Sequence, residues 1–436
     1  MKKIKCIPLF TVLILVAMAG ITAFAYGDGM PILVSIMLNK AQNQANQGKV
    51  ETAIKTLSDF QNKGNAVNEH VAAKKGYSHY YIDFAIANYH IMLSQPEKAA
   101  TCYESAVTKK EDFSQAWLNL AKCRYDLDQM KLAGDAFLKG YETASPKTPL
   151  SLYYSGVCYA GAEEYATSYM VFHRLIDNHP QGIVLEWKGS LVHVLLALKK
   201  SEEALPYIEG LVENTTGTKQ KEWREVLLYQ YMALNLDDKA KAYARYLTQV
   251  DTLEPKWWKA STHIHLQDND YQKAVTALLA YGFLTPLSPE ETSLMGDIFF
   301  ALGIPDQAVK YYEMKRPGDL TPKVAKKIVQ AYMRLYDYDN ALVAINACLQ
   351  GHDAPELMML KGNLLFEMEQ YGEAVGIFQK LIQSDHEKGK SLLMLGYAAW
   401  NVGDMHRAKA AFQEAEKHHK QRKEAQKALK QLEGKS

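Results

Sequence analysis

A small residue recurs along this sequence at nearly constant spacing, and a large apolar residue usually follows it four places later. The small residues are Ala53, Ala99, Ala133, Ser168, Ala204, Ala240, Ala274, Ala308, Ala341, Ala374 and Ala408. Apart from one longer gap between Ala53 and Ala99, they recur about every 34 residues. The residues four places on are Leu57, Tyr103, Phe137, Phe172, Ile208, Ala244, Leu278, Tyr312, Ile345, Phe378 and Phe412. Such a period is typical of an array of repeats, in which each unit packs only on its neighbours.

Each repeat is predicted to contain two helices. A second small residue often stands twelve positions before the first one, as at Ala87, Ala121, Gly156, Gly296, Gly362 and Gly396. An aromatic residue follows at a spacing of three in the same predicted helix, as at Tyr159, Tyr231, Phe299 and Tyr332. Spacings of three and four place residues on one helical face. We expect the small residues to let paired helices approach and the aromatic residue of the second helix to fill the space toward the next repeat. Polar turns such as 302–306 and 401–404 separate the helices.

This pattern resembles the tetratricopeptide repeat (TPR), a helical-hairpin unit of about 34 residues. The residues that carry the resemblance are Gly156, Tyr159, Phe172 and Pro180 in one repeat and Trp117, Leu120, Ala121, Ala133 and Phe137 in another. It covers residues 33–416. The resemblance implies an all-α fold, an α-solenoid of about eleven helix-turn-helix units that form a right-handed superhelix. It also implies a protein that binds protein or peptide partners.

The N-terminus has the pattern of a secretory signal peptide. Lys2, Lys3 and Lys5 form a basic head, an uncharged stretch follows over 6–25, and Ala23-Phe24-Ala25 ends it in a small-x-small pattern. We therefore expect a signal peptide over 1–25 and an exported protein, in the periplasm of a Gram-negative bacterium. The alternative is an uncleaved anchor, because a stretch of about 20 residues is just long enough to span a bilayer.

The remaining chain is predicted to consist of a solenoid and a cap. The solenoid covers 26–416, with an irregular first repeat and a loop at about 62–70 that accounts for the longer gap before Ala99. Residues 417–436 are rich in lysine and keep a thin apolar stripe at Ala425, Ala428, Leu429 and Leu432. We expect them to form a polar C-terminal capping helix, since repeat arrays need polar ends. The alternative is a basic patch that contacts anionic lipid or an acidic partner.

The sequence offers no chemistry of its own. It has 50 basic and 49 acidic residues, so no strong positive field favours nucleic acid. It lacks the motifs of nucleophilic hydrolases, phosphate-binding loops, zinc proteases and dinucleotide-binding folds. Cys102, Cys123, Cys158 and Cys348 lack metal spacing and are expected to be buried thiols. We therefore predict no enzyme, no cofactor and no metal site. A distant alternative is a glycan-binding or enzymatic groove that uses Glu222, Glu225 and Asp297.

The TPR resemblance places partner contacts on the first helix of each repeat, which lines a groove in that family. Carried onto this sequence, the groove positions are Tyr81, Phe84, Asn88, Asn119, Lys122, Tyr125, Tyr153, Tyr154, Tyr229, Phe300, Lys326, Gln330, Asn363, Phe366, Tyr397 and Trp400. Aromatic anchors with amide and lysine donors suit an extended or helical peptide. The alternative for each aromatic residue is a place in the core between repeats.

The sequence therefore predicts an exported protein-binding scaffold or adaptor. Residues 258–313, including 281–287 and 302–308, resemble periplasmic TPR proteins that accompany ExbB–ExbD–TonB type energy-transducing systems. That resemblance implies a partner in an inner-membrane complex and a role in uptake. The alternative is an adaptor in cell-envelope or polysaccharide assembly.

Overall fold

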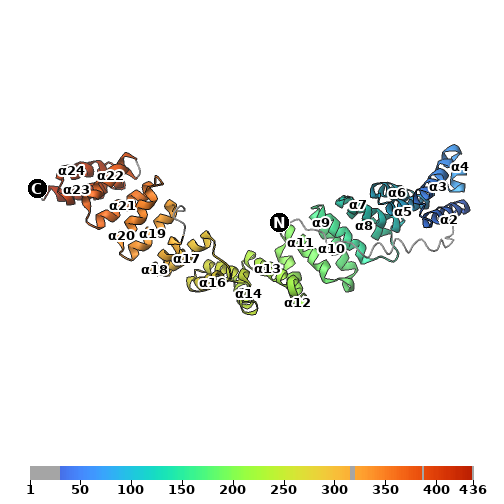
Figure 1. The fold of residues 1–436 in the computed structure, drawn as a ribbon, viewed down its shortest axis with the longest axis horizontal. Helices are drawn as coiled ribbons and strands as arrows, with labels where there is room; N and C mark the ends of the chain where they lie inside the picture. Colours follow the sequence, from blue (N-terminus) through green and yellow to red (C-terminus); the bar gives the residue numbers. More distant parts are fainter. Residues whose placement is uncertain (1–29, 315–319, 385–386, 435–436) are drawn as a thin grey trace. The chain divides into compact units, whose positions relative to one another are not determined.

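The computed structural model describes residues 30–314, 320–384 and 387–434, and every regular element in these ranges is a helix (Figure 1). The predicted all-α helical-repeat solenoid is thus confirmed. The predicted signal peptide over 1–25 lies outside the described residues. The helices form two compact units, which divide between Leu234 and Asn235.

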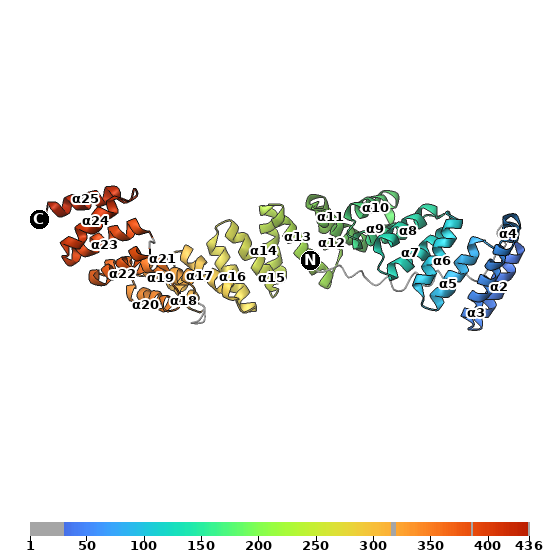
Figure 2. The ribbon, with the colours of Figure 1, turned by 90° about the horizontal axis from the view of Figure 1, so that it is seen from above.

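The first unit is a stack of helix pairs with one short additional helix. Its helices are α2 (Ile32–Asn46), α3 (Val50–Asn62), η1 (Lys63–Ala66), α4 (Glu69–Lys75), α5 (Tyr80–Met92), α6 (Pro96–Lys109), α7 (Ser114–Asp126), α8 (Met130–Thr143), α9 (Pro149–Gly161), α10 (Tyr165–Asn178), η2 (Pro180–Gly182), α11 (Leu185–Ala197), α12 (Ser201–Asn214) and α13 (Gly217–Ala233). From α5 onward, each α-helix packs against the next one along the chain (Figure 2).

The second unit repeats this arrangement without an insertion. Its helices are α14 (Asp237–Val250), α15 (Pro255–Gln267), α16 (Tyr271–Leu284), α17 (Pro289–Ala301), α18 (Pro305–Glu313), α19 (Pro322–Arg334), α20 (Tyr338–Leu349), α21 (Pro355–Glu367), α22 (Tyr371–Gln383), α23 (Lys388–Val402), α24 (Met405–Glu416) and α25 (Arg422–Glu433). We call α2, α5, α7, α9, α11, α13, α15, α17, α19, α21 and α23 the first helices, and the helix that comes after each left-handed turn below, α3, α6, α8, α10, α12, α14, α16, α18, α20, α22 or α24, the second helix.

The periodic small residues lie in the core of both units. All eleven stand on second helices, and each is at most 2% exposed. The residues four places after them are also at most 2% exposed. The periodic pattern in the sequence therefore identified the buried face of every second helix.

The aromatic residue of the second helix packs on the first helix of its own repeat, which corrects the expectation that it fills the space toward the next repeat. A Cβ atom added to Gly156 would lie 2.9 Å from the ring of Phe172, and one added to Gly396 would lie 2.4 Å from the ring of Phe412. The same close approach joins Gly296 to Tyr312. The aromatic ring thus lies in the space that a side chain on the first helix would need. A single methylene group attaches the ring to the second helix and holds it in that space.

A left-handed residue separates the two helices of every repeat. Positive φ angles occur at Gly48, Ser94, Asp128, Glu163, Lys199, Asn235, Asn269, Gly303, Tyr336, Glu369 and Gly403. Each of these residues stands five positions before the periodic small residue, so the turn has the same period as the core. The amide of the residue after the turn residue often donates a hydrogen bond to a carbonyl in the last turn of the first helix. The amide of Glu164, for example, donates to the carbonyl of Tyr159 at 2.9 Å.

Replacing Glu163 by glycine should stabilise the first unit by about 0.5–1 kcal/mol. Glu163 is exposed and has a φ of 61°. A left-handed conformation costs an L-residue roughly 1–2 kcal/mol, and the extra freedom of glycine in the unfolded chain offsets part of that gain. The measurement is urea denaturation followed by circular dichroism. Asn269→Gly, in the second unit, is the control and should gain less, because asparagine tolerates this conformation. A loss of stability in Glu163→Gly would contradict the prediction.

The insertion in the first unit is helical, so the predicted loop at 62–70 is wrong. η1 and α4 occupy most of it. The side chain of Asn68 accepts a hydrogen bond from the amide of Val71 at 2.9 Å and caps α4. Gly76 ends the helix in a left-handed conformation. The extra residues therefore form a short capped helix.

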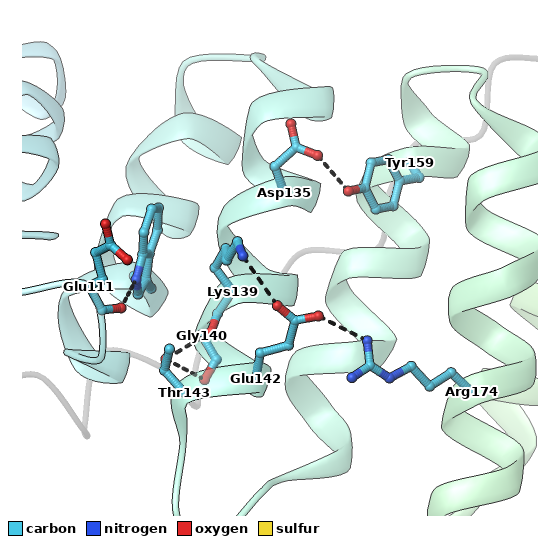
Figure 3. A network of polar contacts seen from close by, with 9 residues as sticks. Glu111, Asp135, Lys139, Gly140, Glu142, Thr143, Tyr159 and Arg174 are labelled. Carbon is cyan, nitrogen blue, oxygen red and sulfur yellow. Dashed lines mark hydrogen bonds and ion pairs between the residues drawn. The ribbon is translucent and has the colours of Figure 1, made fainter. Parts of the chain in front are cut away.

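Polar side chains also join successive repeats (Figure 3). The carboxylate of Glu142 on α8 accepts from Arg174 on α10 at 3.1 Å and lies 3.5 Å from Lys139. The hydroxyl of Tyr159 on α9 donates to Asp135 on α8 at 2.5 Å. Burial, and then this hydrogen bond, raises the pKa of Tyr159. These contacts link neighbouring repeats.

The cysteines are thiols in the described structure, as expected. Cys123, Cys158 and Cys348 are buried and Cys102 is half-buried. Burial raises the pKa of Cys102 to about 11 and that of Cys123 to about 12, so both stay protonated near neutral pH. Among the described residues, no helix is both long and apolar enough to cross a membrane.

Candidate partner-binding surface

Some neighbouring first helices touch each other within each unit. α9 contacts α11 in the first unit, and α21 contacts both α19 and α23 in the second. We call the exposed side of the first helices of each unit the first-helix face. The predicted contacts from Tyr81 to Tyr229 belong to the first unit, and those from Phe300 to Trp400 belong to the second.

Two of the predicted aromatic contacts are core residues. Phe84 is 4% exposed, and its ring lies 4.8 Å from that of Phe113. Tyr153 is 8% exposed and stacks on Trp187 of the next first helix, with ring centroids 5.1 Å apart. A partner cannot reach these rings without displacing the neighbouring repeat. The structure therefore corrects the placement of Phe84 and Tyr153 on the surface.

The two predicted amides of the first unit hold a buried tyrosine. Asn88 accepts a hydrogen bond from the hydroxyl of Tyr103 at 2.5 Å, and Asn119 donates to the same hydroxyl at 3.2 Å. Burial raises the pKa of Tyr103. The side chain of Lys122 pairs with Asp126 one turn along α7. These polar groups stabilise the stack, so they are engaged before any partner arrives.

The remaining aromatic residues of the first unit are accessible to different degrees. Tyr81, Tyr125 and Tyr154 are half-buried, and the ring of Tyr154 lies 5.5 Å from that of Phe137. Tyr229 on α13 is 66% exposed. Of the aromatic contacts predicted in this unit, Tyr229 is the one whose ring is mainly available to a partner.

In the second unit, the predicted aromatic residues are half-buried and some of the polar ones are already paired. The guanidinium of Arg334 lies 3.8 Å from the ring centroid of Phe300. Lys326 pairs with Glu356 at 3.0 Å. Phe366, Tyr397 and Trp400 pack at the edge of the core. Gln330 is exposed, and Asn363 has a buried Oδ1 atom without a hydrogen-bond partner among the described residues.

From α5 onward, a row of apolar residues runs along the first helices three positions before each left-handed turn residue, whereas the corresponding residue of α2, Ala45, is buried. We call this row the pre-turn row. In the first unit it consists of Ile91, Tyr125, Ala160, Leu196 and Met232, and in the second of Leu266, Phe300, Met333, Phe366 and Trp400. Ile91 is exposed and the other nine are half-buried. The sequence-based prediction included its aromatic members and missed the aliphatic ones, although their constant distance from the turn was visible.

The carboxylates considered for a catalytic groove are divided between the two units. Asp297 accepts from Tyr312 at 2.7 Å and from Lys327 at 2.6 Å, so it is part of a structural network. Glu222 and Glu225 belong to the other unit. Among the described residues, no group of three or more His, Cys, Asp and Glu side chains is placed to hold a metal ion.

Comparison with solved structures finds similar helical chains at low sequence identity. A chain of the Naa15/Naa10 complex bound to HypK-THB is 14% identical with a TM-score of 0.42, and the match covers 87% of this chain and 57% of that one. Yeast Tom70 is 14% identical with a TM-score of 0.31, over 92% and 95% of the two chains. YrrB, a TPR protein with an unusual peptide-binding site, is 19% identical with a TM-score of 0.34, over 43% and 94%.

The family comparison matches three segments. Residues 84–149, 150–182 and 389–417 each match a model of the tetratricopeptide repeat. A search of curated protein sequences found no match to this chain. The first two segments cover α6 to α10, where the alternation of small and aromatic residues is most regular, and the third covers most of α23 and α24. These three segments of the chain are similar to the tetratricopeptide repeat.

Proposed function

We propose that this chain is an exported protein-binding scaffold without catalytic activity, and that it holds a segment of a protein partner on its first-helix face. The observation that carries this proposal is the pre-turn row, which places one apolar residue per repeat at the same position of the first helix in each unit. Nine of its ten members are half-buried. Half-buried side chains offer apolar surface between neighbouring protein residues. A partner's side chain that inserts at such a place loses most of its contact with water.

The spacing of the row favours an extended or helical segment. Packed helices lie about 8–10 Å apart. An extended chain in the polyproline II conformation rises about 3.1 Å per residue with three residues per turn, so every third side chain points the same way and advances about 9 Å. A helix advances a similar distance in seven residues. A partner with apolar residues at either spacing places one side chain on each repeat in turn. The partner we expect is a peptide segment with sparse, regularly spaced apolar residues.

The basic head, uncharged stretch and Ala23-Phe24-Ala25 of the N-terminus support export to the periplasm. The resemblance of residues 258–313 to TPR proteins of TonB-type systems supports a partner in an inner-membrane energy-transducing complex. An adaptor in cell-envelope or polysaccharide assembly is the second candidate, and it would use the same face. The identity of the captured partner separates the two.

Site-directed photo-cross-linking in cells tests the use of the face. A photoreactive phenylalanine replaces Ile91 or Tyr229 on first helices, or Leu132 or Met170 on second helices of the same unit. These residues are 43%, 66%, 50% and 61% exposed, so the probes meet solvent to similar degrees. We expect the two first-helix probes to capture one common protein and the second-helix probes to capture none.

Each outcome decides a separate part of the proposal. Equal capture from both kinds of helix, or capture from second helices alone, would reject the first-helix face. Capture of TonB-, ExbB- or ExbD-like proteins would support the energy-transducing role, and capture of wall- or polysaccharide-building proteins would support the assembly role. Export is read separately, from the cell fraction that holds the protein and from the N-terminal residue of the purified chain.

A further inference from the structure

The C-terminal helix α25 presents a straight stripe of lysines to solvent. Lys420 lies just before the helix, and Lys423, Lys427 and Lys430 follow at spacings of three and four, all exposed. At 100° per residue Lys423, Lys427 and Lys430 fall on one side of the helix, and Lys420 lies in the turn that leads into it. The opposite side is buried, where Ala425, Ala428 and Leu432 pack on the core of the second unit. We call Lys420, Lys423, Lys427 and Lys430 the lysine stripe.

The stripe carries charge that its surroundings do not neutralise. Nearby cations are paired: Lys417 contacts Glu414 at 2.5 Å, and Lys409 contacts Glu433 at 3.2 Å. None of the four stripe lysines forms an ion pair with the residues that the structure describes. Residues 417–434 contain six basic residues against Glu424 and Glu433, a net charge of +4 with neutral histidines. The rest of the chain is close to electrically balanced, so this concentration of charge at one end is a local feature.

We propose that the lysine stripe docks on an anionic lipid surface. The stripe is a convex ridge on the outer side of a helix, and a planar surface of headgroups can meet all of its charges at once. Along the helix axis, Lys423 and Lys430 are about 10 Å apart. Lysine acts as a compact point charge, whereas arginine is the residue suited to a fixed carboxylate or phosphate. A diffuse anionic surface fits this choice better than an acidic peptide.

Contact with the lipid is electrostatic and leaves the helix in place. Ala425, Ala428 and Leu432 of α25 are buried in the second unit and Leu429 packs half-buried against the same core, so the helix has little apolar surface to insert between acyl chains. Binding should therefore depend strongly on salt, since exposed charges are screened within about 10 Å at 0.1 M. The inference does not need the proposed first-helix interface. Export decides which membrane the stripe meets, while the docking itself depends on α25 alone.

Sedimentation with lipid vesicles tests the proposal on the chain from Tyr26 to Ser436, which includes every described helix. The vesicles contain phosphatidylcholine alone, or two parts of phosphatidylcholine to one part of phosphatidylglycerol. A lysine near an anionic surface adds roughly fivefold to binding. Replacing all four stripe lysines by glutamine should therefore weaken binding to the anionic vesicles at least about tenfold, and 0.5 M salt should have a similar effect.

A charge-matched variant separates the stripe from net charge. Lys273, Lys310, Lys323 and Lys380 are exposed on four other helices of the same unit, and their replacement by glutamine removes the same charge. This control should bind the anionic vesicles like the original chain, and both variants should keep the original thermal melt. Equal loss in the control, equal binding to neutral vesicles, or binding to polyglutamate without binding to vesicles would overturn the proposal. None of these outcomes bears on cross-linking at the first-helix face.

Discussion

Phe412→Ala should lower the free energy of unfolding of the second unit by about 3–5 kcal/mol, which is the usual cost of truncating a buried phenylalanine. Phe412 is fully buried on α24. Its ring faces Gly396 on α23 and lies 5.1 Å from the ring of Tyr397 in an edge-on arrangement. With no side chain at Gly396, the truncated ring leaves a space that neither helix can fill without moving its backbone.

The measurement is urea denaturation followed by circular dichroism, with the two units observed as separate or overlapping transitions. Met405→Ala on the same helix is the control, because Met405 is 50% exposed. It should change stability by less than about 0.5 kcal/mol. A loss below about 1 kcal/mol in Phe412→Ala would show that α23 and α24 collapse around the gap, and that the ring does not fix their separation.

The helical pairs could be predicted from the sequence because their core is a local pattern. The small residue, its partner four places on and the earlier small residue all lie within one repeat, so their spacing shows which faces must meet. The geometry of the turn between the helices was harder to predict from the sequence. Lys199 and Tyr336 adopt left-handed conformations that favour glycine, since the packing of the two flanking helices fixes the turn. Their residue types alone do not predict that geometry.

The binding face was harder to predict because the exposure of a first-helix residue depends on the next repeat. Tyr153 and Tyr154 are adjacent aromatic residues, and the sequence alone does not indicate which of them is more deeply buried. Tyr153 is buried because Trp187 of the next first helix stacks on it. Tyr229, on the last helix of its unit, is 66% exposed. How deeply a first-helix residue is buried therefore depends on contacts between repeats. The sequence pattern within one repeat does not predict those contacts.

The short helix α4 was missed for another reason. The sequence contains the two residues that cap this helix, Asn68 before it and Gly76 after it. The expected repeat has no element at this point, so the residues beyond the normal period were assigned to a loop. The division of the chain between Leu234 and Asn235 has no comparable signal, since the periodic small residues continue across it with their usual spacing.

Gly296→Ala should destabilise the second unit by about 1–3 kcal/mol, against the normal preference of helices for alanine. In a helix interior, alanine is usually favoured over glycine by about 1 kcal/mol. At Gly296, however, the added Cβ atom would lie 2.4 Å from the ring of Tyr312. The ring is held by its hydroxyl, which donates to Asp297 at 2.7 Å, so it cannot swing away without breaking that bond.

Gly376→Ala provides the matched control in the same unit. Gly376 lies inside α22, and a Cβ atom there would have no neighbour within 4 Å. This substitution should therefore stabilise the unit by about 0.5–1 kcal/mol. The two variants make the same chemical change and differ in what the new methyl group meets. Opposite shifts of the urea midpoint would show that close approach of the paired helices decides which small residues the repeat requires. Stabilisation by both would mean that the ring of Tyr312 gives way, and that Gly296 is not needed for packing.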